Sequence, residues 1–245
     1  MSDISPTAPA EDIPECPDCG KPQLLCVCDS LAPVENGIEV LILQHPQEQD
    51  RLLGTARLTA LQLSNATLKI GLSWPSLSKA LGRDVDPADW SILYLGSAKV
   101  ADLETDRDVV AIDRKGGLEH GQNAILNNLE GVVVLDGTWS QAKALWWRNP
   151  WMLKCQRVIL GPKQLSLYGR LRREPRSDGL STIEATALLL ARLEKKPEIA
   201  VALFGAFERM LAKYREAVKT HPELLPKPKP RRDWRKGRKP GRRRS

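Results

Sequence analysis

The sequence predicts an α/β fold, with a mostly parallel sheet flanked by helices. The first observation is an unbroken apolar run at residues 132–135, which is typical of a strand buried on both faces of a parallel sheet. The second is that strand patterns alternate with helical patterns along the chain. At 245 residues, the chain has room for one α/β domain with short additions or for two small domains.

The first half of the chain supplies several strands and helices. Residues 38–43 are rich in Val, Ile and Leu and predict a strand that ends at His45, because Pro46 disfavours helix there. We expect His45 on a turn at the carboxyl end of this strand, as a hydrogen-bonded loop residue or, less favoured, as a ligand contact. Further apolar spacing predicts helices at residues 51–63 and 76–81, and strands at 67–72, 91–95 and 109–113.

The second half continues the alternation. A helix is predicted at residues 118–129, after two glycines, and the buried strand that ends at Asp136 follows it. The next helix, at residues 140–148, stops at Asn149-Pro150, and a strand is predicted at 157–160. Two further helices complete the domain. The last of them opens at Pro197 and carries a core stripe of Ile199, Leu203, Phe207, Leu211 and Tyr214.

The turn at Asp136 is the first candidate site. Ligands in open α/β sheets bind just past the carboxyl ends of strands, and Asp136 stands at that position. Gly137 permits a tight turn, and Thr138 or Ser140 can cap the helix that follows. Spacing alone leaves two interpretations open: a ligand site, or a structural turn in which Asp136 only accepts bonds from the backbone.

A cluster of cysteines near the amino terminus predicts a metal site. Four of the five cysteines follow the spacing C-x2-C-x6-C-x-C. Without a secretion signal a disulfide is not expected, whereas four close thiolates suit a tetrahedral Zn²⁺ site with a structural role. A redox-active or coincidental cluster is the alternative. The predicted ligands are Cys16, Cys19, Cys26 and Cys28.

An arginine-rich stretch forms the second candidate site. Arg170, Arg172, Arg173 and Arg176 precede a segment that fits a capping box, with Ser181 as the N-cap and Glu184 reaching back. Arginine binds carboxylate or phosphate with two parallel hydrogen bonds, and the free N–H groups of a helix start also favour anions. A solvated basic loop before an ordinary capped helix is the alternative.

The charge of the chain is concentrated at its carboxyl end. Residues 226–245 hold 11 Lys or Arg and one Asp, whereas the other 225 residues carry a net charge of −3. Such a segment is expected to be disordered when free and to bind a polyanion, RNA above all, through side chains that include Arg231, Arg232 and Arg235. The predicted organisation is a disordered leader at residues 1–14, a zinc module at 15–36, a catalytic domain at 37–225 and the basic tail at 226–245.

The sequence also favours a cytoplasmic protein. The first residues are acidic and lack an apolar block, and no apolar run reaches the length of a bilayer, so no membrane partner is expected. Cys155 is expected to be buried as a small apolar side chain. Most tryptophans at positions 139, 146, 147 and 151 are expected in the core, although one exposed indole would suit stacking on a base.

Several of these motifs together resemble the DTW-domain family. Asp136-Gly137-Thr138-Trp139 matches the D-x-T-W signature, and the cysteine cluster, His45-Pro46 with Glu48, and residues 171–175 and 180–185 follow in the family's order. The resemblance covers roughly residues 16–215 and is closest to bacterial tRNA-uridine aminocarboxypropyltransferases. It implies a relationship to the SPOUT superfamily, whose sheet carries a knotted carboxyl-terminal part that binds S-adenosylmethionine. The basic tail is not part of the family pattern.

The resemblance also implies a reaction and its residues. Uridine N3 would attack the γ-carbon of S-adenosylmethionine, the 3-amino-3-carboxypropyl group would move to the base, and methylthioadenosine would leave. The catalytic group would be Asp136 as general base, with Thr138 and Trp139 beside it. Cofactor binding is expected at Gly137, Arg172, Ser181, Thr182 and Glu184, and tRNA binding at Arg170, Arg173, Arg176 and the tail.

Two alternatives accompany this expectation. A SPOUT-type RNA methyltransferase would use the same cofactor, and a non-catalytic zinc-containing RNA-binding protein would need only the cysteine cluster and the basic tail.

Overall fold

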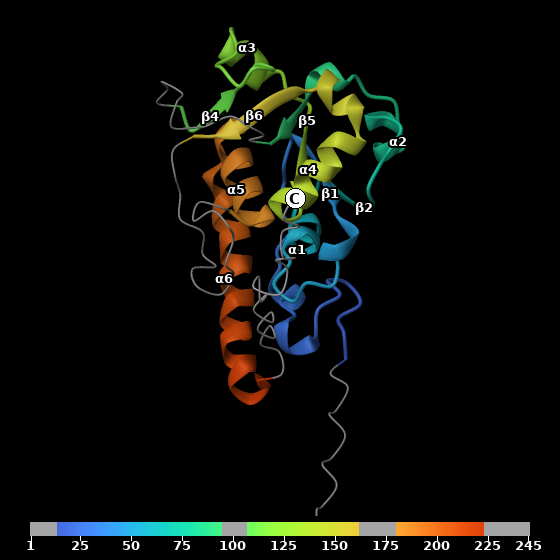
Figure 1. The fold of residues 1–245 in the computed structure, drawn as a ribbon. Coiled ribbons are helices and arrows are strands. Elements are labelled where there is room, and N and C mark those ends of the chain that lie inside the picture. Colours follow the sequence, from blue (N-terminus) through green and yellow to red (C-terminus); the bar gives the residue numbers. More distant parts are fainter. Residues whose placement is uncertain (1–13, 95–106, 162–179, 223–245) are drawn as a thin grey trace, which may run out of the picture.

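The computed structural model describes residues 14–94, 107–161 and 180–222. Its centre is a six-stranded sheet in the order β2-β1-β5-β3-β6-β4, drawn in Figure 1. The first five strands in this order run parallel, and β4 pairs antiparallel with β6 at one edge. The strands are β1 (Glu39–Gln44), β2 (Ala66–Ile70), β3 (Trp90–Leu93), β4 (Val109–Ala111), β5 (Gly131–Asp136) and β6 (Gln156–Leu160).

Helices cover both faces of the sheet, as the sequence predicts. On one face lie α1 (Ala56–Gln62), α5 (Thr182–Leu193) and α6 (Pro197–Thr220), and on the other α2 (Leu77–Leu81) and α4 (Trp139–Arg148). The short α3 (Gln122–Asn127) lies beside β4. Single turns of 3-10 helix are η1 (Gln23–Leu25), η2 (Cys28–Ser30), η3 (Pro46–Glu48), η4 (Pro87–Asp89) and η6 (Pro150–Lys154).

The position of β5 between two helical layers explains its unbroken run of apolar residues. Val132 and Val134 belong to the cluster under α1, α5 and α6, whereas Val133 belongs to the cluster on the opposite face. Successive side chains of a strand point to opposite faces, so a strand between two helical layers needs apolar residues at every position. The α6 stripe from Ile199 to Tyr214 is buried as predicted, and Cys155 is buried too.

Two helices begin later than the sequence predicts. The helix predicted from residue 51 begins only at Ala56, because the carbonyl groups of Leu52 and Gly54 accept hydrogen bonds from Lys21 instead of continuing a helix. The helix predicted from residue 118 begins at Gln122, since Leu118 forms a β-bridge. The antiparallel edge strand β4 agrees with the prediction, which is of a mostly parallel sheet.

The register of β1 and β5 determines which side chains share an edge of the sheet. Gln44, the last residue of β1, lies opposite Asp136, the last residue of β5. The neighbouring strands β2 and β3 run in the same direction, so their carboxyl ends meet at this edge too. Among the helices of the described ranges, none is both long and apolar enough to cross a membrane.

Candidate active site at the carboxyl edge of the sheet

Asp136 is the central charged group of this edge. Its side chain is only 8% exposed, and both of its carboxylate oxygens accept hydrogen bonds from other side chains. The amide Nε2 of Gln44 donates to Oδ2 at 2.8 Å, and the hydroxyl of Thr182 donates to Oδ1. Because each carboxylate oxygen offers about two lone pairs, these bonds orient the group and still leave acceptor capacity for a ligand.

The backbone around Asp136 forms a tight turn into α4. The backbone N–H of His45 donates to the carbonyl oxygen of Asp136 at 2.9 Å, which joins the ends of β1 and β5. A Cβ atom added at Gly137 would lie 2.9 Å from the Cβ of Gln141, so a larger residue does not fit there without displacement. The imidazole Nδ1 of His45 accepts from the N–H of Gln47, which supports the favoured loop role.

The start of α4 presents polar groups beside Asp136. Thr138 is the N-cap, and its backbone N–H donates to Oε1 of Gln141 at 2.6 Å in a capping box. The hydroxyls of Thr138 and Ser140 lie 3.2 Å apart, and the amide of Gln141 also donates to Oε1 of Gln47. Thr138 and Gln141 are half-buried and Ser140 is exposed, so this helix start is open to solvent.

The predicted capping box at the start of α5 is confirmed. Oε2 of Glu184 accepts from the backbone N–H of Ser181 at 2.8 Å and from its hydroxyl at 2.6 Å. Ser181 and Glu184 are 2% and 1% exposed. The N–H of Ile183 donates to the hydroxyl oxygen of Thr55, so two donors of this helix start already have protein acceptors. Direct contact of Ser181 or Glu184 with a cofactor stays a prediction, whereas Thr182 reaches Asp136.

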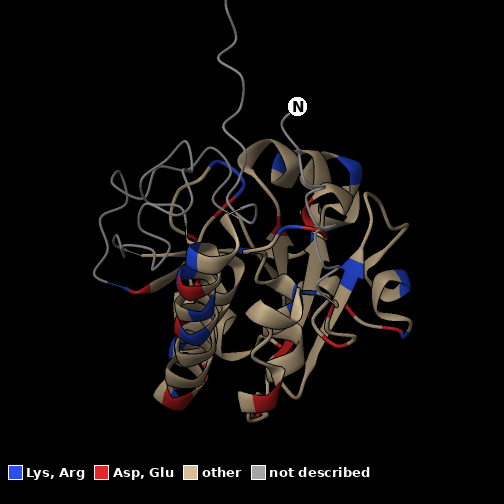
Figure 2. Cartoon of the chain, turned by 90° about the horizontal axis from the view of Figure 1, so that it is seen from below, with Lys and Arg blue, Asp and Glu red and all other residues tan. Residues whose placement is uncertain are grey.

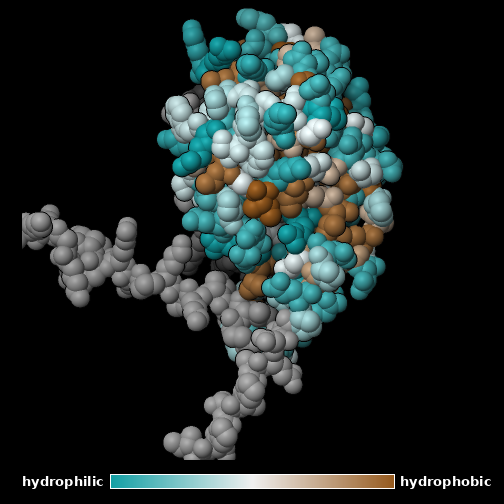
Figure 3. Space-filling model, turned by 90° about the vertical axis from the view of Figure 1, so that its right-hand side faces the viewer, coloured by the Kyte–Doolittle hydropathy of each residue, from teal (hydrophilic) through white to brown (hydrophobic). Residues whose placement is uncertain are grey.

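The tryptophans divide between core and surface. Trp151 is buried, Trp139 is half-buried at the first position of α4, and Trp146 stacks on Tyr94 with ring centroids 4.9 Å apart. Trp147 is the exception to the expected core role, because 72% of it is exposed. It lies on the outer side of the helix that begins beside Asp136. The side of the molecule that carries α2 and β2 also shows apolar side chains among hydrophilic ones (Figure 3).

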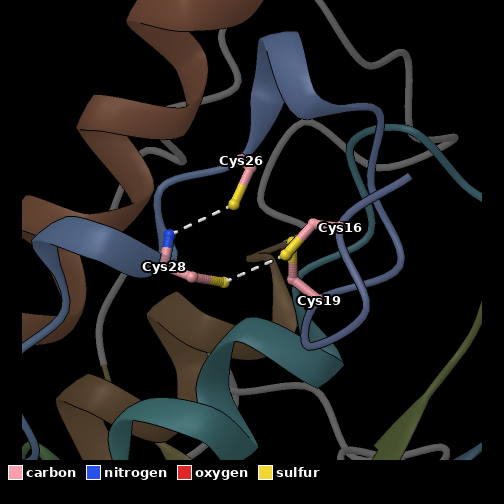
Figure 4. A group of neighbouring side chains, drawn as sticks. All are labelled: Cys16, Cys19, Cys26 and Cys28. Atoms are coloured by element: carbon pink, nitrogen blue, oxygen red, sulfur yellow. Dashed lines mark hydrogen bonds between the residues drawn. The ribbon is translucent and has the colours of Figure 1, made fainter. Parts of the chain in front are cut away.

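The cysteine cluster has the geometry of a metal site. The four sulfur atoms lie within 4.8 Å of one another, and those of Cys16 and Cys28 are 3.9 Å apart (Figure 4). Tetrahedral coordination at a Zn–S distance of about 2.3 Å separates sulfur atoms by roughly 3.8 Å, so the donor set fits Zn²⁺. Burial raises the pKa of Cys19 and of Cys28, whereas the backbone N–H of Cys19 lowers the pKa of Cys16 to about 7.

The cysteine module, residues 15–36, packs against α1 and α6. Lys21 is 6% exposed, and its Nζ donates to the carbonyl oxygens of Leu52 at 2.8 Å and Gly54 at 2.7 Å. Burial lowers the pKa of Lys21 to about 8. On the other side, the Nζ of Lys213 in α6 donates to the carbonyl oxygen of Cys26. These two lysines join the module to the segment before α1 and to α6.

Several predicted residues lie outside the described ranges. These are the tRNA-binding candidates Arg170, Arg173, Arg176, Arg231, Arg232 and Arg235, and the cofactor candidate Arg172. Sequence reasoning also missed three residues of the site, Gln44, Thr55 and Lys21. The only sequence signal for Gln44 is its place at the end of a predicted strand, beside the motif His45-Pro46. Thr55 and Lys21 carry none, because their partners come from distant segments.

The fold and the site define a class: an α/β protein with a buried carboxylate at the carboxyl edge of a parallel sheet and an attached four-cysteine module. The DTW domain family matches residues 13–215, and the chain belongs to that family. No solved structure matches the chain.

Three curated relatives carry the name tRNA-uridine aminocarboxypropyltransferase 2. The one from Macaca fascicularis is 30% identical over 217 residues, which are 84% of this chain and 65% of the relative. The one from Mus musculus is 32% identical over 203 residues, 78% of this chain and 60% of the relative. The one from Drosophila melanogaster is 30% identical over 191 residues, which are 76% of this chain and 68% of the relative. The chain thus spans about two thirds or less of the length of these relatives.

Proposed function

We propose that this chain transfers the 3-amino-3-carboxypropyl group of S-adenosylmethionine to N3 of a uridine in tRNA. The observation that carries the proposal is the position of Asp136, the first residue of the D-x-T-W motif, at the carboxyl edge of the sheet. The chain belongs to the DTW domain family and is similar to proteins named for this reaction. S-adenosylmethionine is the second substrate: its sulfonium makes the γ-carbon electrophilic, and methylthioadenosine leaves.

The chemical task of the protein follows from uridine N3. This nitrogen carries a proton, and its lone pair attacks only when that proton is lost. In the proposal Asp136 accepts the N3 proton, N3 forms a bond to the γ-carbon, and the carbon–sulfur bond breaks with its electrons moving to sulfur. Gln44 and Thr182 hold the carboxylate in one orientation, so that the acceptor oxygen is aimed before the substrates bind.

The neighbouring groups have supporting roles in this proposal. Thr138 and Trp139 open α4 next to Asp136 and are proposed to contact the uracil or the adenosyl group, and Gly137 is proposed to contact the cofactor through its backbone. Arg172 and Arg173 are proposed to hold the carboxylate of the donor or a tRNA phosphate. The SPOUT relationship and the knot also belong to this proposal, and the segment 162–179 lies outside the described ranges.

The tRNA is proposed to bind through two different kinds of contact. Lys and Arg of the described surface are interspersed with Asp and Glu (Figure 2), so the strongly basic sources are the arginines at residues 170–176 and the tail at residues 226–245. Trp147 presents an exposed indole that suits stacking on a base. Removing residues 226–245 should flatten the salt dependence of tRNA binding and leave turnover at saturating tRNA nearly unchanged. A salt slope equal to that of the full chain would exclude the tail from RNA contact.

Zinc is proposed as the structural metal of the cysteine module. The purified protein should contain about one Zn²⁺ per chain, and Cys19→Ser should lower both the metal content and the melting temperature. Cys155→Ser is the matched control, because Cys155 is buried away from the cluster. Metal-free protein with an unchanged melting temperature in Cys19→Ser would contradict the zinc site.

The function itself is tested by the products. Mass spectrometry of nucleosides from tRNA treated with the protein and S-adenosylmethionine should show 3-(3-amino-3-carboxypropyl)uridine, with methylthioadenosine formed in equal amount. Methylated uridine with S-adenosylhomocysteine would support a methyltransferase instead. An unchanged nucleoside profile, with tRNA still bound, would support a non-catalytic RNA-binding protein.

A further inference from the structure

The segment between β1 and α1 connects Gln44 with Thr55, and both residues are linked to the hydrogen bonds that orient Asp136. It starts after Gln44, which donates to Oδ2 of Asp136. It ends at Thr55, whose hydroxyl accepts from the N–H of Ile183, the residue next to Thr182. The hydroxyl of Thr182 donates to Oδ1 of Asp136. Displacement of this segment would therefore disturb both hydrogen bonds to the carboxylate.

The interior of this segment consists of successive turns. The N–H of Glu48 donates to the carbonyl oxygen of His45, the N–H of Arg51 to that of Glu48, and the N–H of Gly54 to that of Arg51. Apart from the single 3-10 turn η3, the segment belongs to no helix or strand. Their far end is held by the side chain of Lys21, which donates to the carbonyl oxygens of Leu52 and Gly54, and by the packing of Leu52 and Leu53 against the buried cluster of Leu25 and Tyr214.

Lys21 makes these bonds from within the cysteine module, two residues after Cys19. An ammonium that is 6% exposed is held there by charge-assisted hydrogen bonds, which are shorter and stronger than neutral ones. The preceding Gly20 has φ +64°, and a Cβ atom on it would lie 2.6 Å from Nη1 of Arg57 in α1. The module therefore approaches the start of α1 closely, and Lys21 contacts the turn that precedes this helix.

We propose that Lys21 is a positioning residue for Asp136, and that the cysteine module thereby sets the geometry of the active site. Lys21 fixes Leu52 and Gly54, these place Thr55, and Thr55 holds the start of α5 so that Thr182 meets Asp136. The proposal rests on the proposed function for the role of Asp136, but the linkage is structural and has its own readout.

The test replaces Lys21 by methionine in the full, zinc-loaded chain. Lys21→Met keeps an unbranched side chain of similar length and removes both hydrogen bonds. We expect zinc content to stay at about one per chain and the backbone amide of Ile183 to exchange with solvent faster. We expect kcat to fall by up to about a hundredfold, the effect of a misplacement of about 1 Å in a catalytic geometry. KM for both substrates should change less than kcat, because Lys21 is buried and both of its hydrogen bonds go to backbone carbonyl groups.

Lys213→Met is the matched control. It removes the lysine that joins Cys26 to α6 and leaves the contacts of Lys21 intact. It should lower the melting temperature while Ile183 exchange and kcat stay near the wild-type values. Equal losses of kcat in the two variants would show general loosening and overturn the proposal, as would wild-type kcat and Ile183 exchange in Lys21→Met.

A second pair of variants covers the case in which Lys21→Met does not fold. Thr55→Val keeps the shape of the side chain and removes the acceptor for Ile183. Thr59→Val is the control, because it removes a buried hydroxyl that donates to the backbone carbonyl of Thr55 and leaves the Thr55 hydroxyl in place. Faster Ile183 exchange and lower kcat in Thr55→Val alone would support the linkage, and wild-type values there would overturn it. If wild-type protein makes no modified uridine, the proposed function fails, whereas the exchange data still decide the linkage.

Discussion

Helices α4 and α5 both begin with a capping box, and the two boxes lie on either side of Asp136. The box of α4 pairs Thr138 with Gln141, and both residues are partly open to solvent. The box of α5 pairs Ser181 with Glu184, and both are buried. The same local motif therefore has two different uses. The buried box fixes a helix within the core, whereas the open box presents hydroxyl and amide groups at the carboxyl edge of the sheet, the edge at which α/β sheets in general bind ligands.

Asp136 lies next to both helix starts and is the proposed general base, so its replacement should have the largest effect on activity. In Asp136→Asn, Gln44 can still donate to the remaining carbonyl oxygen, and the hydroxyl of Thr182 can turn to accept from the new amide. The shape is kept, but the proton acceptor is lost. We expect the chemical step, measured by single turnover at saturating substrates, to slow by about 10²–10⁴-fold.

The pH dependence separates the two possible roles of Asp136. As pH rises toward the ionisation of uridine N3, the base becomes less necessary, so Asp136→Asn should regain part of its rate relative to wild type. A melting curve serves as the control for stability. A variant that loses activity only in proportion to its loss of folded protein would assign Asp136 to the structural turn.

The buried box should matter most for stability. Glu184→Ala leaves the backbone N–H and the hydroxyl of Ser181 without their acceptor in a site that water does not reach. An unsatisfied buried donor costs about 1–3 kcal/mol, and we expect urea denaturation to show a loss of this size. Glu198→Ala is the matched control, because Glu198 is an exposed acid in the first turn of α6. A loss no larger than that of the control would contradict the assigned role.

The comparison of the boxes also shows what the sequence alone predicts. Both helix starts, the Asp136 turn, the buried strand β5 and the α6 stripe depend on local spacing, and each was predictable. The bonds to Asp136 depend instead on residues 92 and 46 positions away in the chain. Their meeting is set by strand register and helix packing, which no local pattern contains.

The late start of α1 has the same cause. Residues 51–55 have the spacing of a helix, but Lys21 takes the carbonyl groups of Leu52 and Gly54, which a helix would use for its own hydrogen bonds. The burial of Ser181 and Glu184 was not predictable either, because the sequence pattern of a capping box is the same at an exposed and at a buried helix start.

The open box provides the smallest expected change in stability and the sharpest test of the comparison. Gln141→Ala removes the acceptor for the N–H of Thr138 and the contact with Gln47, but water can replace both because the side chain is only half-buried. We expect a loss of about 0.5–1 kcal/mol in the free energy of unfolding, the usual size for a helix cap.

If α4 opens into the ligand site, kcat/KM should nevertheless fall about tenfold, since Thr138 loses the bond that fixes its backbone next to Asp136. The two boxes would then show opposite profiles, with Glu184→Ala costing mainly stability and Gln141→Ala mainly activity. Steady-state kinetics well below the melting temperature of either variant measure the difference. Wild-type kcat/KM in Gln141→Ala would mean that the start of α4 lies outside the ligand site, and that the exposure of its capping box has no bearing on the reaction.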